Sequence, residues 1–163
     1  MASLDLISTL IICVVLMENI GYLLGDSSRL LRRAFDDGVR AIGVTGPQAR
    51  LLLYMARVEG ENQGHYADRL EVEPITLCRM VDRMEEAGLV ERRRDPADRR
   101  AWRVHLTERS RAMITELRGC VDTMVEDMMS GISPPDRESF TRILTAMSAN
   151  LAARRDSRAL VNG

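Results

Sequence analysis

The feature that most constrains the fold is a turn between two short segments of alternating apolar residues. The turn, residues 95–100, reads Asp-Pro-Ala-Asp-Arg-Arg, and the flanking segments are residues 88–94 and 101–107. Two strand-like segments joined by a turn that contains proline and aspartate are typical of a β-hairpin. We therefore predict a small antiparallel hairpin at this point of the chain.

This hairpin is rich in arginine. Against three acidic residues it carries six arginines, and these are Arg92, Arg93, Arg94, Arg99, Arg100 and Arg103. Planar guanidinium groups with a permanent charge suit contact with a phosphate backbone or with a narrow minor groove. Alone, such a hairpin could equally be a solvated charged element, so its meaning depends on the segment before it.

That segment, residues 73–88, is predicted to be a helix. Pro74 is tolerated in a first helical turn, where its missing N–H has no intrahelical partner. Gly88 provides a stop at the C-terminal end. Apolar residues recur at intervals of three and four and predict a buried stripe, which consists of Leu77, Met80, Val81 and Met84.

Three other side chains of this helix, Thr76, Arg79 and Arg83, fall away from the buried stripe and towards solvent or a ligand. A shorter helical segment precedes it at residues 64–70, and residues 71–73 form a tight link. The order of helix, short turn, helix and basic hairpin is that of a winged helix-turn-helix, whose second helix reads the DNA major groove.

The segment from Tyr66 to Arg111 resembles the DNA-binding core of the multiple antibiotic resistance regulator (MarR) family. The matching residues are 67–70, Pro74, Thr76, 79–86, 88–92, 95–100 and 106–108. The most specific part is the Asp-x-x-Asp-Arg-Arg wing followed by a Leu-Thr-Glu helix start, and looser similarity covers residues 18–155. The chain departs from the family pattern at Glu73, Ile75 and Cys78.

The resemblance implies roles for individual residues. We expect Thr76 and Arg79 to contact bases and Arg83 to contact phosphate. The wing contacts are expected from Arg94, Arg99 and Arg100, with Asp98 orienting a wing arginine through a charge-assisted bond. In relatives, small aromatic or phenolic ligands occupy a crevice between the dimerisation helices and the winged lobe. The candidates for lining such an effector pocket are Tyr22, Phe35, Tyr54 and Trp102, each of which could instead be ordinary packing.

The flanking helices carry more apolar surface than one small domain can bury, which indicates a dimer interface built from both ends of the chain. We thus expect a mainly α fold with a small β-hairpin wing, a winged helix-turn-helix with N- and C-terminal dimerisation helices. The expected parts are an apolar extension (1–17), a dimerisation helix (18–44), the winged helix-turn-helix DNA-binding domain (45–106), C-terminal dimerisation helices (107–155) and a flexible tail (156–163).

The apolar stretch between Leu4 and Met17 allows three interpretations. It is short of the roughly 20 residues needed to span a bilayer, and it lacks the basic flank of a secretory signal. It could be a helical extension buried in a dimer or an anchor that touches a membrane. Alternatively, the start is assigned too early and the natural beginning is Met17, next to the point where the family resemblance begins.

The other sequence features exclude several classes of protein. A net charge of −1 over 163 residues argues against a generally basic nucleic-acid coat, so any DNA affinity depends on how charge is distributed. The three cysteines, Cys13, Cys78 and Cys120, match neither a zinc site nor a disulfide framework. A redox role for Cys78 stays open. No catalytic constellation, metal site or cofactor motif is apparent, so we do not expect an enzyme.

The sequence therefore predicts a cytoplasmic, homodimeric transcriptional regulator, a repressor released by a small aromatic or phenolic ligand. A dimer with two reading helices implies a double-stranded, pseudo-palindromic operator whose half-sites lie about one helical turn apart. No membrane partner is expected. The alternative is a protein–protein interaction module that keeps the winged-helix shape without binding DNA.

Overall fold

The computed structural model describes residues 2–98 and 101–161, and side chains within 19–98 and 101–154. In chain order the elements are α1 (Ala2–Arg40), α2 (Gly46–Met55), α3 (Gln63–Leu70), α4 (Pro74–Glu86), β1 (Val90–Arg94), β2 (Trp102–Leu106), α5 (Glu108–Met128) and α6 (Pro134–Val161). They confirm the predicted mainly helical fold with a small hairpin. The chain divides into two compact units, residues 1–124 and 125–163.

The core of the first unit is formed where α2, α4 and the hairpin meet the ends of α1 and α5. Its apolar side chains are nearly inaccessible to water, and the largest of them include Leu51, Leu52, Met55, Tyr66, Leu77, Met84 and Leu117. All four residues of the stripe predicted for α4 are buried. Burial of these side chains fixes α4 on the lobe and determines which of its sides faces outward.

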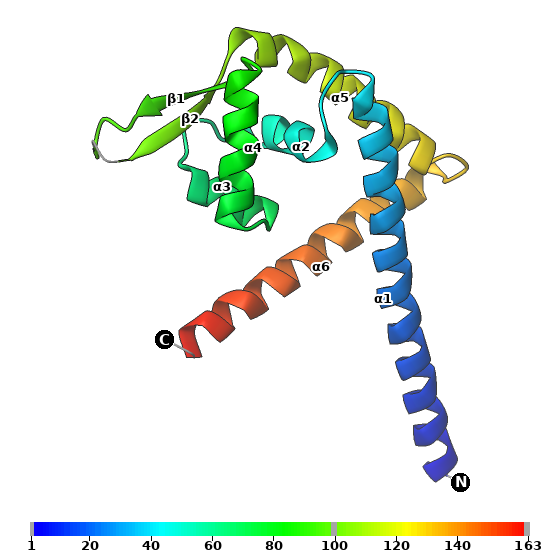
Figure 1. Ribbon diagram of the computed structural model, residues 1–163. Coiled ribbons are helices and arrows are strands. Elements are labelled where there is room, and N and C mark those ends of the chain that lie inside the picture. The colour runs from blue at the N-terminus through cyan, green and yellow to red at the C-terminus, as the bar shows by residue number, and fades with distance from the viewer. Residues whose placement is uncertain (1, 99–100, 162–163) are drawn as a thin grey trace. The chain divides into compact units, whose positions relative to one another are not determined.

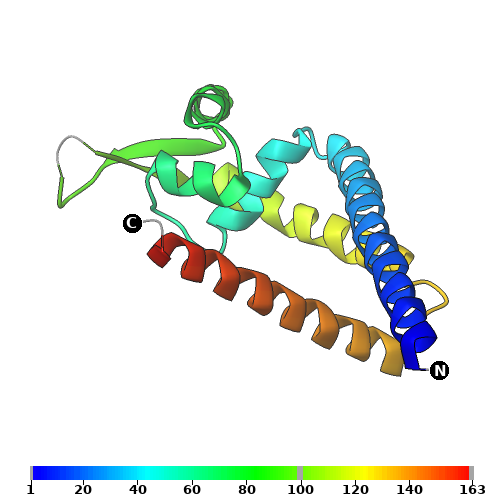
Figure 2. The ribbon, with the colours of Figure 1, turned by 90° about the horizontal axis from the view of Figure 1, so that it is seen from below.

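The two strands form an antiparallel pair whose register runs from Val90 opposite Leu106 to Arg94 opposite Trp102. Val90, Val104 and Leu106 point into the core, so the base of the hairpin is anchored by apolar packing. At the other end of the pair Arg94 and Trp102 are exposed, and the two strands extend away from the lobe on the side opposite α1 (Figures 1 and 2).

Helix α1 is longer than the helix we expected from residue 18, because it runs without a break from Ala2 to Arg40. Its C-terminal part joins the core through Phe35 and Val39. Here α1 comes so close to the start of α2 that a Cβ on Gly46 would lie 1.7 Å from a carboxylate oxygen of Asp36. A side chain here would displace the Asp36 carboxylate, which pairs with Arg50.

Helix α2 is short and ends at Met55. In the second unit, Ser133 hydrogen bonds to Asp136 in the first turn of α6. Helix α6 continues to Val161, where we expected a flexible tail from residue 156. Among residues 2–98 and 101–161, no helix has both the length and the apolar character needed to cross a membrane.

Candidate nucleic-acid interface and adjoining pocket

The helix-turn-helix is shaped by local bonds at the ends of α3. The side chain of Asn62 accepts a hydrogen bond from the N–H of His65 at 2.9 Å and caps the start of α3. At its other end Glu71 adopts a left-handed conformation, with φ of 53°, and reverses the chain towards α4. This is an uncommon conformation for a residue other than glycine. The turn places α4 across α3 with its polar side outward.

The outward side of α4 carries the three side chains predicted to meet DNA, Thr76, Arg79 and Arg83, and all three are exposed. Arg83 donates a hydrogen bond to the carbonyl of Arg79 at 3.2 Å. Within the described part of the chain, no ion pair or hydrogen bond engages the Arg79 guanidinium, which leaves it available to a ligand. Ile75 lies beside them and is 60% exposed, an unusual place for a large aliphatic side chain.

Arg92 ties the hairpin to α4, a role that we did not predict. Its guanidinium contacts Asp82 at 2.5 Å and also pairs with Glu85, while its backbone N–H donates to Glu85 at 2.9 Å. Its side chain is only 17% exposed. Arg92 therefore belongs to the scaffold that holds the wing beside the reading helix, rather than to the surface open to DNA.

A second arginine, Arg103, also braces the hairpin. It donates to Asp95 at 2.7 Å and to the carbonyl of Gly60 at 3.0 Å. The backbone N–H of Ala97 and the Arg103 guanidinium both donate to Asp95 and hold the pKa of this carboxyl below its ordinary value. Asp95 thus orients Arg103 of the hairpin, a contact that we did not predict, and the orienting role expected of Asp98 stays a prediction.

The predicted wing contacts are described only in part. Arg94 lies over the ring of Trp102, with its guanidinium carbon 4.4 Å from the ring centroid, and both residues are exposed. Asp98 lies in the turn, where its carbonyl accepts a hydrogen bond from Ala101. Arg99 and Arg100 lie outside the described residues.

The base of the hairpin is joined to α5 through Glu59. One oxygen of this carboxylate accepts from the N–H of Leu106 at 2.9 Å, and Arg111 donates to both oxygens at 2.6 and 2.9 Å. His105 lies 3.6 Å away. Burial opposes ionisation of Glu59, but the bonds from Arg111 and Leu106 outweigh it and hold the pKa of the carboxyl below its ordinary value.

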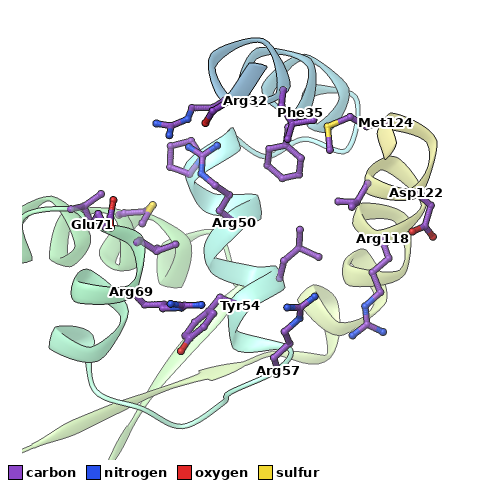
Figure 3. A pocket seen from close by; sticks show the side chains of 18 residues that line it. Arg32, Phe35, Arg50, Tyr54, Arg57, Arg69, Glu71, Arg118, Asp122 and Met124 are labelled. Carbon is purple, nitrogen blue, oxygen red and sulfur yellow. The ribbon is translucent and has the colours of Figure 1, made fainter. Parts of the chain in front are cut away.

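A pocket with a volume of about 970 Å³ lies within the first unit, lined by residues of α1, α2 and the segment after it, α3, the α3–α4 turn, α4 and α5. Figure 3 shows Phe35 and Tyr54 on opposite sides of the hollow, with Arg50 between them. Arg50 pairs with Asp36 at 3.0 Å, and its guanidinium carbon lies 5.8 Å from the centre of the Phe35 ring. The site thus combines aromatic surface with positive charge.

Two of the four residues expected in an effector pocket, Phe35 and Tyr54, line this one. The other two are not brought to it. Tyr22 is 73% exposed on α1, and Trp102 packs with Arg94 on the hairpin. We did not predict the arginines that line the pocket, because sequence spacing does not reveal which residues of separate elements converge in the fold.

Tyr54 connects the pocket to the helix-turn-helix. Its hydroxyl and the Nε2 of His65 on α3 lie 3.0 Å apart in a hydrogen bond, and the two rings stack. The guanidinium carbon of Arg69, also on α3, lies over the Tyr54 ring, 5.5 Å from its centroid. A residue of the pocket wall is therefore in direct contact with the first helix of the DNA-binding motif.

The redox role left open for Cys78 stays a prediction. Cys78 is half-buried on α4, with its sulfur 3.9 Å from a carboxylate oxygen of Asp82. In the part of the chain that the structure describes, no three His, Cys, Asp or Glu side chains gather in a way that could hold a metal ion.

Comparison with known proteins agrees with this geometry. Residues 42–101 match the model of the MarR family. A MarR transcriptional regulator from Methanosarcina mazei Go1 is 26% identical, with a TM-score of 0.75 over 82% of this chain and 96% of that one. A MarR-family regulator from Silicibacter pomeroyi is 29% identical, with a TM-score of 0.68 over 80% of this chain and 88% of that one.

A third similar structure is the transcriptional repressor CouR bound to a 23-mer DNA duplex, which is 28% identical, with a TM-score of 0.70 over 82% of this chain and 94% of that one. The family match covers the helix-turn-helix and the start of the wing, and the similar structures extend over the flanking helices. The winged core thus matches the MarR family model, and the chain is similar over most of its length to transcriptional regulators of that family.

Proposed function

We propose that this protein is a cytoplasmic transcriptional repressor that binds a pseudo-palindromic DNA operator as a homodimer and releases it when a small ligand binds. The observation that carries the proposal is the exposed side of α4, where Thr76, Arg79 and Arg83 lie next to a hairpin held in place by Arg92. Such a helix fits the major groove while the wing follows the backbone. The DNA-bound structure of CouR, a similar protein, supports this arrangement.

A homodimer is supported by apolar surface that each unit leaves open. Helix α1 exposes Ile20, Leu23 and Leu30, and α6 exposes Phe140 and Ile143. Monomeric proteins seldom leave large apolar side chains exposed in groups. A second copy of the chain would cover them, and two reading helices related by a two-fold axis require an operator with the same symmetry.

Ligand control is supported by the pocket and by its contact with α3 through Tyr54. Its aromatic walls suit an aromatic or phenolic effector. A ligand can change DNA affinity only if it binds one conformation better than the other. The hydrogen bond from the pocket wall to His65 offers a direct physical link for such a difference.

The test is a fluorescence-anisotropy titration with the intergenic DNA upstream of the gene and with random DNA of equal length, at several salt concentrations. We expect tighter binding to the intergenic DNA and a log–log salt slope that falls by about one unit in Arg100→Ala. The matched control is Arg142→Ala, an exposed arginine of α6. Absence of salt-dependent affinity for either DNA would favour the alternative, an interaction module that does not bind DNA.

A further inference from the structure

The arginines that line the pocket outnumber the carboxylates beside them. Five arginines line it, from α1, α2, the segment after α2, α3 and α5, whereas the acidic residues in the lining are Glu71 and Asp122. Asp36 adds a third carboxylate through its ion pair with Arg50. Five guanidinium groups against three carboxylates leave an excess of two positive charges.

Three of these guanidinium groups have no partner within the described residues. No hydrogen bond, ion pair or ring contact there involves the side chain of Arg32, Arg57 or Arg118. Figure 3 shows Arg57, from the segment after α2, and Arg118, from α5, at the same end of the hollow. Guanidinium groups match the planar oxygen pairs of carboxylates and phosphates, and several of them together favour a ligand of more than one charge.

The rest of the lining provides an apolar surface. Phe35, Tyr54, Leu53, Val121 and Met124 contribute carbon-rich side chains, and the volume of about 970 Å³ is near the upper end for pockets that hold small organic ligands. A bare inorganic anion would leave the apolar wall uncovered.

We propose that the pocket selects an organic dianion, an aromatic or acyl group joined to a phosphate or to a pair of carboxylates. This proposal rests on the effector role proposed above and adds the charge that the ligand must carry. The apolar group lies against the apolar lining, and the anionic group lies at the end of the hollow where Arg57 and Arg118 meet (Figure 3). A neutral phenol uses only half of this site.

The experiment compares ligands that share one ring and differ in charge. Phenol, benzoate, phthalate and phenyl phosphate are titrated calorimetrically into the full chain at pH 8 without DNA, together with inorganic phosphate. We expect the two dianions to bind about tenfold more tightly than benzoate, with phenol weakest, and the difference to shrink with added salt. The ratio of phthalate to phenyl phosphate distinguishes the dicarboxylate from the phosphate ester.

Equal affinity for benzoate and both dianions would overturn the proposal. Inorganic phosphate binding as tightly as phenyl phosphate would also overturn it, because the apolar wall would then contribute nothing. Arg57→Gln and Arg118→Gln should each weaken phenyl phosphate about threefold to tenfold and leave phenol unchanged. Arg33→Gln, at the exposed neighbour of Arg32 outside the lining, is the matched control.

Loss of dianion binding in Arg93→Gln, on the hairpin, but not in the pocket variants would place the anion at the wing and contradict the proposal. Operator affinity is measured separately. A protein that binds operator without any preference for dianions refutes only this inference. A protein that binds dianions in the pocket without binding DNA refutes the proposed function and leaves the charge selectivity intact.

Discussion

At the scale of the residue, the exposed side chains of α4 differ in whether they form hydrogen bonds within the protein. Arg83 is bound to the helix backbone, whereas the guanidinium of Arg79 meets no partner in the described residues. Ile75 exposes apolar surface at the start of the same helix. These differences lead to separate expectations for base contacts and backbone contacts.

Arg79→Ala should reduce discrimination between operator and random DNA by about 1–3 kcal/mol, the value of a bidentate base contact. Arg83→Ala should weaken both kinds of DNA equally, because a phosphate contact carries no sequence information. Both values come from anisotropy titrations at one salt concentration. Identical behaviour of the two variants would show that our division of base and backbone contacts is wrong.

Ile75 should contact a thymine methyl group, the apolar feature of the major groove. We expect replacement of that thymine by deoxyuridine to lower affinity roughly fourfold, since a buried methyl group is worth about 0.8 kcal/mol. The same replacement should have no effect on Ile75→Ala. A scan of single uridine substitutions through the operator tests this, and full sensitivity retained in the variant would contradict it.

At the scale of the element, the orientation of the wing depends on ion pairs between segments. Arg92 joins β1 to α4, and Glu59 joins the base of β2 to α5. Neither residue needs to touch DNA to matter for binding, because each fixes the position of an element that does. The stability of the lobe should therefore respond to both.

Arg92→Ala should destabilise the fold by about 1–3 kcal/mol, because the largely buried guanidinium makes charge-assisted hydrogen bonds to Asp82 and Glu85 that the variant loses. Arg93→Ala is the matched control, since the side chain of Arg93 is 60% exposed, and its loss should cost under about 1 kcal/mol. Urea unfolding followed by circular dichroism gives both values. Equal losses would argue against a bracing role for Arg92.

Glu59→Gln should lower the melting temperature at neutral pH, with an effect that depends on pH. Because the folded pKa of Glu59 lies below its ordinary value of 4.5, ionisation stabilises the fold above that value. This contribution is lost as pH falls from 4.5 through the folded pKa, so wild type and variant should converge in acid. Glu116→Gln, at an exposed position of α5, should show no such convergence. A gap that is constant between pH 7 and pH 3 would contradict the assignment.

Elements whose evidence is local were predicted well from sequence. The buried stripe of α4 follows from apolar spacing alone, and the hairpin follows from its turn and its two flanking segments. Contacts between distant residues were not predicted. Glu59 and Arg111 meet across 52 positions, and nothing in the local pattern around either residue indicates its partner. For the same reason, the sequence did not reveal that Phe35 and Tyr54 line the pocket and that Trp102 does not.

At the scale of the whole molecule, the proposed dimer depends on apolar side chains left open along α6. Ile143→Asp should shift sedimentation towards the monomer, because a carboxylate would have to be buried without a partner. Ala149→Asp introduces the same charge on the opposite side of this helix, at an exposed position, and should leave the dimer intact. A dimer that persists in the first variant would exclude this side of α6 from the interface.

The contact between Tyr54 and His65 has a consequence for cellular control. If the pocket and the helix-turn-helix are coupled through it, thermodynamic linkage makes the coupling reciprocal. The operator must then lower affinity for the effector by the same factor by which the effector lowers affinity for the operator. Free protein would capture the metabolite first, so a larger pool of unbound repressor would raise the concentration of metabolite needed for induction. The sensitivity of the switch would thus depend on how much of the protein the cell makes.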